Sequence, residues 1–234
     1  MKNSLNILIT LIFLFTALNL SAQDSIMQRH MRITDFSQVM LNGDFMVDIV
    51  LGDAPTVTII APEVDLKKVN VDMDQGSLII SLTEARASDS LIRVRIQARR
   101  IMKIKATGSI DIRTPERLNA DALMIDLAGD ASAILDVTSM RVSVRMDNSS
   151  SLVLSGGCAV LLGEMKGESD LNAFSVQVTR ADLTMTDKSK ARINVKDQIK
   201  ARVTSEAVLE YQGNPELQTE GSREGGVRRV MPSN

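Results

Sequence analysis

Apolar and polar positions alternate along most of the chain. The alternation is clear over residues 45–51 (FMVDIVL), 76–82 (GSLIISL), 91–98 (LIRVRIQA) and 101–106 (IMKIKA). Alternation with a period of two is typical of strands that have one buried face. Only residues 61–69 (APEVDLKKV) indicate a short helical turn. The pattern therefore predicts an all-β protein.

A short Ser-led phrase recurs in the second half of the chain. Its anchor residues are followed by apolar residues at the second and fourth positions, and successive anchors are 16 to 24 residues apart. The second of the six expected inward pairs, Ile134 and Asp136, breaks the rule because Asp136 is charged. The anchors are Gly108, Ser132, Ser150, Ser169, Ser189 and Ser205, and the other pairs are Ile110 and Ile112, Leu152 and Leu154, Leu171 and Ala173, Ala191 and Ile193, and Ala207 and Leu209.

A second alternating strand precedes most of these anchors. A repeat near twenty residues indicates a solenoid, because no single unit can bury its apolar face alone. Each unit consists of two short strands and two turns, so parallel stacking gives a β-helix with about 4.8 Å of height per coil. The predicted inward residues of these strands are Leu123, Ile125 and Leu127; Val142, Val144 and Met146; Ala181, Leu183 and Met185; and Ile199, Ala201 and Val203.

The Ser, Gly, Asp and Asn residues of the phrase suit tight corners, where their side chains can bond to the backbone. An antiparallel sandwich of short hairpins is the alternative architecture. Its Asn-Gly or Asp-Gly hairpin signal is present only weakly, at residues 41–44 (LNGD). The scarcity of aromatic residues also favours a narrow solenoid core, since the chain has five Phe, one Tyr and no Trp.

The first 22 residues have the pattern of a secretory signal peptide. Lys2 precedes a mainly apolar run from Leu5 to Leu20, and Ser21-Ala22 provides a small residue at the predicted cut. An uncleaved anchor is the alternative, although polar residues dilute the run, and a span needs roughly 20 mostly apolar residues. We therefore expect export, to the periplasm, the outer-membrane surface or the extracellular space, with no transmembrane span after cleavage.

The net charge and the single cysteine indicate which partners and which covalent links to expect. Removing residues 1–22 leaves 26 basic and 29 acidic residues, a formal charge of −3. This near-balance argues against a nucleic-acid partner, for which a strongly basic face is expected. Cys158 is the only cysteine, so no intrachain disulfide can form, and we expect it to be a buried packing residue.

The N-terminal strands resemble a known family. Residues 36–62 (FSQVMLNGDFMVDIVLGDAPTVTIIAP) and 69–82 (VNVDMDQGSLIISL) are similar to the opening of the putative auto-transporter adhesin family with the head GIN domain, and residues 211–222 (YQGNPELQTEGS) resemble its end. The resemblance covers about residues 33 to 228 and implies a single-stranded right-handed parallel β-helix. The family has no shared catalytic residue or ligand to transfer. The positions that match its opening are Phe36, Gly43, Phe45, Gly52, Val57, Ile59, Gly76, Leu78 and Ile80.

The expected organisation follows from these observations. Residues 1–22 are a signal peptide, residues 23–32 a flexible lead-in, and residues 229–234 a disordered tail. The head GIN-type domain spans residues 33–228, with N-terminal strands over 33–106 that continue into repeat coils over 107–228.

Signs of catalysis are sparse. His30 is the only histidine and lies in the expected lead-in, which argues against a Ser-His-Asp triad or a His-bearing zinc site. No phosphate-binding glycine motif is present. Stacked carboxylates could suit glycoside hydrolysis, with outward solubilising and turn positions as the simpler interpretation. We expect no cofactor and no metal. The stacked carboxylates are Asp111, Asp126, Asp130, Asp136, Asp147, Asp170, Asp182 and Asp187.

A basic stripe is the best candidate binding feature. Five basic residues are expected on the outward side of two successive strands, where an anionic glycan or lipid headgroup could bind. A solvated strand face that protects a sheet edge explains them as well. The sequence favours an exported, non-enzymatic envelope or surface protein with an adhesion or structural interaction role, whose partner is an anionic glycan, an envelope lipid or another surface protein. A carbohydrate-active enzyme or glycan-binding protein on the same scaffold is the alternative. The stripe consists of Arg93, Arg95, Arg99, Lys103 and Lys105.

Overall fold

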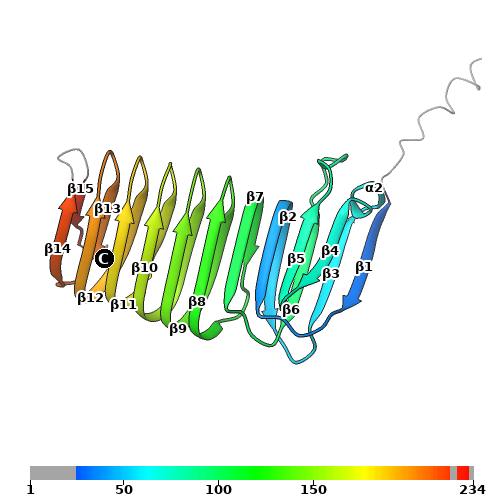
Figure 1. Ribbon diagram of the computed structural model, residues 1–234, viewed down its shortest axis with the longest axis horizontal. Coiled ribbons are helices and arrows are strands. Elements are labelled where there is room, and N and C mark those ends of the chain that lie inside the picture. The colour runs from blue at the N-terminus through cyan, green and yellow to red at the C-terminus, as the bar shows by residue number, and fades with distance from the viewer. Residues whose placement is uncertain (1–24, 222–225, 232–234) are drawn as a thin grey trace, which may run out of the picture.

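The protein is an elongated β-solenoid in the computed structural model, which describes residues 25–221 and 226–231 (Figure 1). Its strands form one mostly parallel sheet that coils around a single apolar core. The expected all-β solenoid is confirmed, while its right-handedness stays a prediction from the family resemblance. The predicted signal peptide lies outside the described residues. The strands are β1 (Ile26–Arg32), β2 (Gln38–Leu51), β3 (Thr56–Pro62), β4 (Val69–Asp74), β5 (Ser77–Leu82), β6 (Arg93–Ala98), β7 (Lys103–Arg113), β8 (Leu118–Ala128), β9 (Ser132–Met146), β10 (Ser151–Met165), β11 (Asp170–Met185), β12 (Lys190–Val203), β13 (Val208–Gln212), β14 (Glu216–Gly221) and β15 (Gly226–Arg229).

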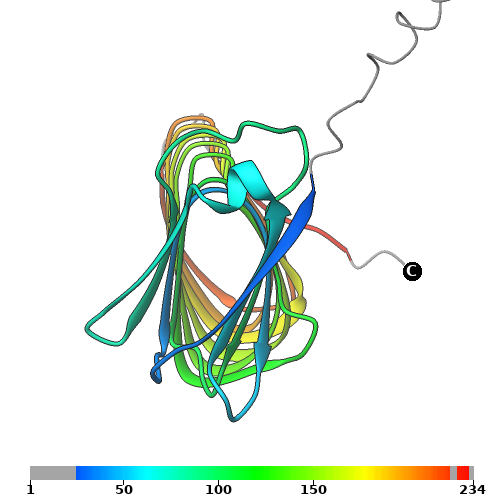
Figure 2. The ribbon, with the colours of Figure 1, turned by 90° about the vertical axis from the view of Figure 1, so that its right-hand side faces the viewer.

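Each coil has two walls, joined by a tight turn at one end and a wider bend at the other (Figure 2). We call the wall that faces the viewer in Figure 1 the front wall; its strand segments, such as residues 160–165 and 180–185, run into the tight turns. The back wall holds the segments that follow those turns, such as residues 151–158. Strands β9 to β12 bend through both walls, which explains their 14 to 16 residues.

Inward residues form parallel rows because the coils stack in register. Leu152 pairs with Ala133 on one side and Leu171 on the other, and all three are buried. The predicted inward residues Ile110 and Ile193 are also buried, and the predicted second-strand residues are all in the core. No antiparallel pair occurs among β7 to β15 in the described ranges, so the sandwich alternative is wrong.

Three of the predicted corners are out of register. In the first of them Ile110, not Gly108, takes the place of Ser150, because Asp111 pairs with Ser132. Ser132 pairs with Ser151, so the true counterpart of Ser150 is the buried Ala131. The inward residues of this coil are consequently Ala133 and Leu135, whereas Ile134 points to solvent. At the last corner, Ala207 takes the place of Ser189, because Val208 pairs with Lys190. Alanine and serine are both small enough for the buried corner, so the Ser-led pattern slipped by one or two residues at the last two of these corners.

Tight turns are set by one residue with a positive φ in each coil. Gly129, Asn148, Gly167, Asp187 and Ser205 occupy this position, with φ between 58° and 78°. At Gly167 a Cβ atom would lie 2.9 Å from the backbone N and O of Asn148 in the coil before. Glycine is favoured there both because the left-handed region penalises other residues and because the neighbouring turn is close.

The N-terminal end is built differently from the repeats. Strands β1, β3 and β6 pair antiparallel in that order, and β6 then joins β2 in parallel. The hairpin of β4 and β5 extends the front wall through the pairing of β5 with β2. The expectation of a flexible lead-in is wrong for residues 26–32, which form β1, and part of the expected disordered tail is wrong as well, since β15 includes Arg229.

A short helix and a loop complete this end. The predicted helical turn is confirmed as α2 (Glu63–Leu66), which lies beside β1 near the end of the solenoid, while β1 crosses that end obliquely (Figure 2). Residues 83–92 form a loop that we call the strap. The fully buried carboxylate of Asp65 accepts hydrogen bonds from the Ala87 amide at 2.6 Å and the Ser88 hydroxyl at 2.6 Å. Arg86 Nε contacts Asp44 Oδ2 at 2.7 Å, so the strap is fixed at two points.

Candidate functional site: a basic surface on the N-terminal strands

The five residues of the predicted stripe do not share one wall of the solenoid. Arg93 and Arg95 are paired with Met46 and Asp48 in the second half of β2, on the back wall. Lys103 and Lys105 are paired with Gln38 and Met40 in its first half, on the front wall. All four side chains point outward, as predicted, but they do not form one continuous stripe. The strand alternation was correct, and the error lay in assuming that successive strands are neighbours on one wall.

Two residues of the stripe already have partners within the chain. Lys103 Nζ lies 3.5 Å from Asp126 Oδ2 in the next coil. Arg99 donates from Nε to the backbone oxygen of Asp53 at 2.8 Å, and its Nη1 lies 3.8 Å from Asp35. Both residues therefore have structural contacts at the bends and between coils.

Antiparallel pairing adds basic residues that the sequence pattern did not point to. His30 and Arg32 of β1 are paired with Thr58 and Thr56 of β3, which in turn are paired with Arg95 and Gln97 of β6. His30 Nδ1 and Thr58 Oγ1 are 2.9 Å apart, which fixes the imidazole on the outward side of the sheet. We call the outward side of these three strands the N-terminal basic surface; it consists of His30, Arg32, Thr56, Thr58, Arg93 and Arg95.

This surface is uninterrupted by acidic residues. None of β1, β3 and β6 contains Asp or Glu, and the side chains of His30, Arg32, Arg93 and Arg95 are exposed. Neighbouring strands are about 4.8 Å apart, so β1 and β6 are about 10 Å apart across β3. The small threonines between them leave a flat strip, with His30 and Arg32 on one side and Arg93 and Arg95 on the other. The first acidic neighbour is Asp48, on the far side of Arg95.

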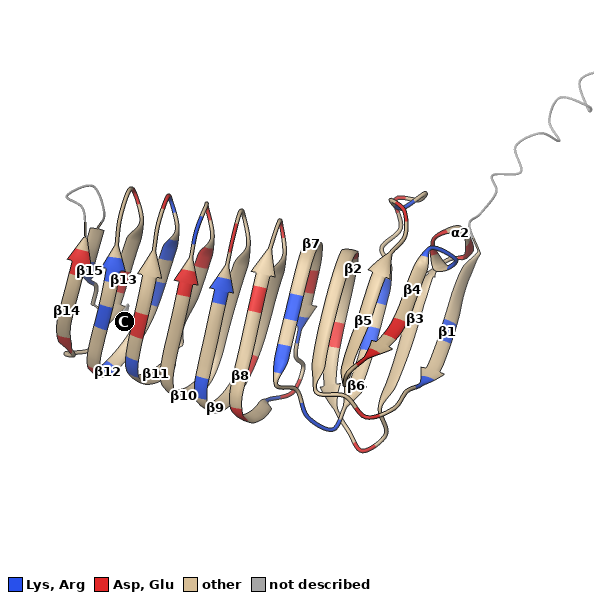
Figure 3. Cartoon of the chain, in the orientation of Figure 1, with Lys and Arg blue, Asp and Glu red and all other residues tan. Residues whose placement is uncertain are grey.

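The front wall offers a contrasting surface. Residues in register along it alternate in sign, from Lys105 through Asp126 and Arg145 to Glu164, as Figure 3 shows along β7 to β10. Arg145 Nη2 and Glu164 Oε2 form an ion pair of 3.0 Å. The charges along this row are offset within the protein itself.

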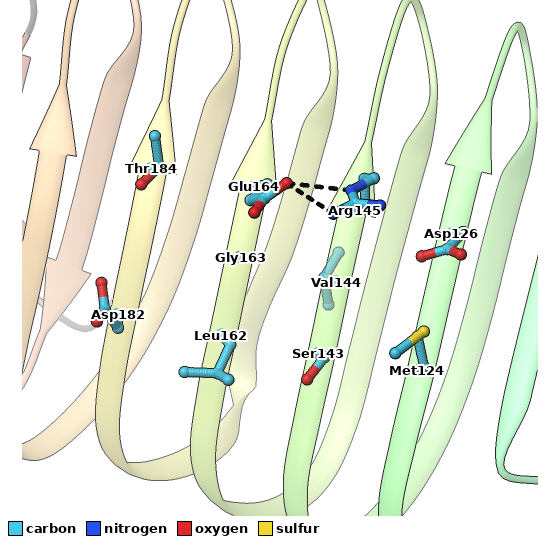
Figure 4. Close-up of a pocket in the computed structure, with 10 residues that line it drawn as sticks. All are labelled: Met124, Asp126, Ser143, Val144, Arg145, Leu162, Gly163, Glu164, Asp182 and Thr184. Atoms are coloured by element: carbon cyan, nitrogen blue, oxygen red, sulfur yellow. Dashed lines mark hydrogen bonds and ion pairs between the residues drawn. The ribbon is translucent and has the colours of Figure 1, made fainter.

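A shallow hollow of about 370 Å³ lies on the front wall (Figure 4). Ser143 lies between the longer Met124 and Leu162, and the Arg145–Glu164 pair borders the hollow. Asp126 and Asp182 also line it. The hollow contains charges of both signs, because Arg145 lines it together with these carboxylates.

Most of the predicted stacked carboxylates have partners in neighbouring coils or turns. Asp170 accepts two hydrogen bonds of 2.8 Å from Arg192, and Asp136 accepts one of 2.9 Å from Arg117. Asp111 accepts a hydrogen bond from the Ser132 hydroxyl. Asp147 and Asp187 bond to backbone amides at the tight turns. These contacts agree with the simpler interpretation, in which the carboxylates serve turns and coil pairing.

The remaining chemical candidates do not form a site. Cys158 is buried, and burial raises the pKa of its thiol to about 11, so the thiol is protonated at neutral pH. Over residues 25–221 and 226–231, no group of three or more His, Cys, Asp or Glu side chains is arranged to hold a metal ion. The same residues include no helix of the length and apolarity needed to span a membrane.

A parallel β-solenoid with a separately built N-terminal end defines the structural class. Residues 35–215 match the family described as putative auto-transporter adhesin, head GIN domain, and the chain belongs to this family. The resemblance stated from the N-terminal strands is thereby confirmed. The expected domain of residues 33–228 extends beyond the matched range.

Solved structures share the fold at low sequence identity. A putative adhesin from Bacteroides fragilis has a TM-score of 0.80 at 14% identity, and one from Parabacteroides distasonis has 0.74 at 16%. A protein described as a putative lipid binding protein, also from Parabacteroides distasonis, has 0.70 at 13%. Each comparison covers 89% of this chain and 98% of the other. A search of curated proteins found no match.

Proposed function

We propose that this is an exported, non-enzymatic envelope or surface protein that binds an anionic partner through its N-terminal basic surface. Such binding would serve adhesion or a structural role in the cell envelope. The proposal of export rests on the signal-peptide pattern of residues 1–22. The partner would be an acidic glycan or an anionic lipid headgroup, which share the negative charge that the surface attracts.

The observation that supports this proposal is the difference in charge pattern between the two surfaces. Along the front-wall row from Lys105 to Glu164, each cation has an acidic neighbour in the next coil, so little charge is left there for a partner. On β1, β3 and β6, His30, Arg32 and Arg93 have no acidic residue in register beside them, and Asp48, paired with Arg95, is the one acidic neighbour of this surface among the described strands. Like charges this close repel one another, and an anionic partner would relieve that repulsion.

The family context is compatible with the proposal. The family is described by adhesion, and one solved relative is described as a putative lipid binding protein. This second description is a reason to include lipid surfaces in the test. The carbohydrate-active enzyme alternative has less support, because most of the stacked carboxylates are engaged in turns and ion pairs.

The experiment measures retention of the purified mature protein on an acidic polysaccharide and on vesicles with anionic lipid. Retention is expected at low salt and should weaken near physiological ionic strength, where exposed charges are screened beyond about 8 Å. Arg93→Glu combined with Arg95→Glu should abolish it. Because both side chains face water, the fold should be unchanged.

A matched control changes the net charge by the same amount elsewhere. Arg141 and Arg180 are exposed arginines that lie two strands apart in register on the front wall. Arg141→Glu combined with Arg180→Glu should leave retention nearly unchanged. If this control loses retention to the same extent, or if the wild-type protein is not retained at low salt, the proposed surface is wrong.

A further inference from the structure

The C-terminal end of the solenoid has two unpaired strand edges. β14 pairs only with β12, and β15 only with β13, among the described residues. All six residues of β14 are exposed. An unpaired edge is a template for pairing with another chain.

The core is also incompletely covered at this end. Leu217 is 41% exposed, although it is in register with Ile199, which is fully buried in the preceding coil. Val227 continues the row of the buried Leu209 but is itself only half-buried. When another surface covers an apolar row that ends in solvent, the free energy falls, because apolar surface is removed from water.

The two terminal strands have opposite charge. β14 contains Glu216 and Glu220 and no basic residue, whereas β15 contains Arg228 and Arg229 and no acidic residue. The strands also run in opposite directions around the coil. β14 lies parallel to β12 and runs toward the tight turns, and β15 lies parallel to β13 and runs away from them.

We propose that this end is an interface between two copies of the chain, with β14 of each copy against β15 of the other. A twofold axis that lies across the end and runs along the strands produces this arrangement. It brings the acidic strand of each copy against the basic strand of its partner, in antiparallel orientation, and it covers the apolar end rows of both cores. The contact is isologous, so the assembly closes as a dimer.

Charge disfavours the other ways of stacking the ends. A twofold axis perpendicular to the strands would place β14 against β14 and β15 against β15, which brings like charges together. A head-to-tail stack would place β14 beside β4, whose charged residues are Asp72 and Asp74. It would also require an open N-terminal end, which β1 crosses obliquely (Figure 2). An open-ended filament is therefore disfavoured, and the closed dimer is favoured.

Sedimentation of the mature protein over a concentration series tests the dimer. The interface consists of two short strand pairs, so we expect a concentration-dependent monomer–dimer equilibrium that weakens with added salt. A protein that remains monomeric up to about 1 mM, the weak end of specific affinities, would overturn the proposal.

Charge reversal locates the interface. Glu216→Arg with Glu220→Arg makes both terminal strands basic, and Arg228→Glu with Arg229→Glu makes both acidic, so each variant alone should be monomeric. An equimolar mixture of the two should form a heterodimer, because each strand then meets one of opposite sign. The variants lose the Arg202–Glu220 ion pair, which is exposed, and the Arg228–Glu210 ion pair, in which Arg228 is exposed and Glu210 is half-buried. Ion pairs at the surface contribute little to stability, so the fold is expected to persist, as circular dichroism can check.

The Arg141→Glu and Arg180→Glu variant is again the control and should still dimerise. The proposed interface would be contradicted if either charge-reversed variant of β14 or β15 dimerised alone. It would also be contradicted if the mixture failed to associate while both variants were folded. A dimer that is unaffected by all these changes would place the contact elsewhere on the chain.

Discussion

The two ends of the solenoid differ in how the apolar core is covered. At the N-terminal end, antiparallel strands, helix α2 and the strap enclose the core, and Val69 of β4 is only 3% exposed. At the C-terminal end no described strand lies beyond β14 and β15, and β14 is exposed along its whole length. Solenoid repeats contact only their neighbours, so a terminal repeat needs either a cap or a partner.

The difference separates two sources of stability. The repeat coils are held by parallel rows of buried apolar residues and by backbone hydrogen bonds between successive coils. The N-terminal end depends on specific contacts, above all those that Asp65 and Arg86 make with neighbouring segments. Substitutions in the two regions should therefore act through different mechanisms.

The largest effect is expected from a cavity in a central coil. Leu171 is fully buried, and Leu171→Ala should lower the free energy of unfolding by about 2–5 kcal/mol. The same change at the exposed end, Leu217→Ala, should cost less than about 1 kcal/mol. Urea denaturation of both variants gives the comparison. Equal losses would mean that the C-terminal end is as well covered as the centre.

The next effect is expected at the buried carboxylate of the N-terminal end. Asp65→Ala removes the acceptor for the Ala87 amide and the Ser88 hydroxyl and should cost about 1–3 kcal/mol at neutral pH. Asp74→Ala, at an exposed position of β4, is the control and should stay within about 0.5 kcal/mol.

The cost of Asp65→Ala should depend on pH. Burial disfavours the charged carboxylate, but the hydrogen bonds from Ser88 and Ala87 outweigh burial and hold the pKa of Asp65 below its usual value. Its contribution is therefore present above the ordinary pKa of aspartate, about 3.9, and is lost as the pH falls through the lowered folded-state value. Chemical denaturation at several pH values should show the two proteins converging in acid. A constant difference would contradict this account.

A smaller effect is expected at the tight turns. Gly167→Ala should lower stability by about 1–2 kcal/mol, because alanine is penalised at positive φ and its Cβ would crowd Asn148. Asn148→Gly, at the same position one coil earlier, should be neutral or slightly stabilising. Thermal unfolding distinguishes the two variants, and a neutral Gly167→Ala would show that the turns can relax.

The smallest effect is expected for the exposed ion pairs of the front wall. Removing the Arg145–Glu164 pair through Arg145→Ala should cost less than about 1 kcal/mol, and less still at high salt. A double-mutant cycle with Glu164→Ala isolates the interaction. A coupling well above this value would mean that the alternating charges are a principal source of coil stability.

Much of the repeat region could be predicted because stacking imposes a regular pattern on the sequence. The inward rows that contain Leu152, Leu171 and Ile193 follow directly from the recurring phrase. The register at Ser132 could not be predicted, because Ala131 and Ser150 fill the same small corner, and serine alone does not distinguish the inward position from the next one.

The N-terminal end was harder to predict for a physical reason. Alternation shows that a strand has one buried face, but it contains no information about which strand lies beside it or in which direction it runs. The antiparallel order of β1, β3 and β6 is therefore absent from the pattern. For the same reason the predicted stripe joined Arg95 and Lys103, which lie on opposite walls, and omitted His30 and Arg32.

Hydrogen–deuterium exchange of the mature protein, at a concentration low enough to keep it monomeric, tests most directly whether one end is closed and the other open. Amides of β5 and β6 should be protected nearly as well as those of β9 to β11, because β4, β1 and β3 cover them. Amides of β14 and β15 should exchange much faster, because their outer edges have no partner strand among the described residues. Equal protection of β14, β15 and the central coils, or rapid exchange throughout β5 and β6, would contradict this account.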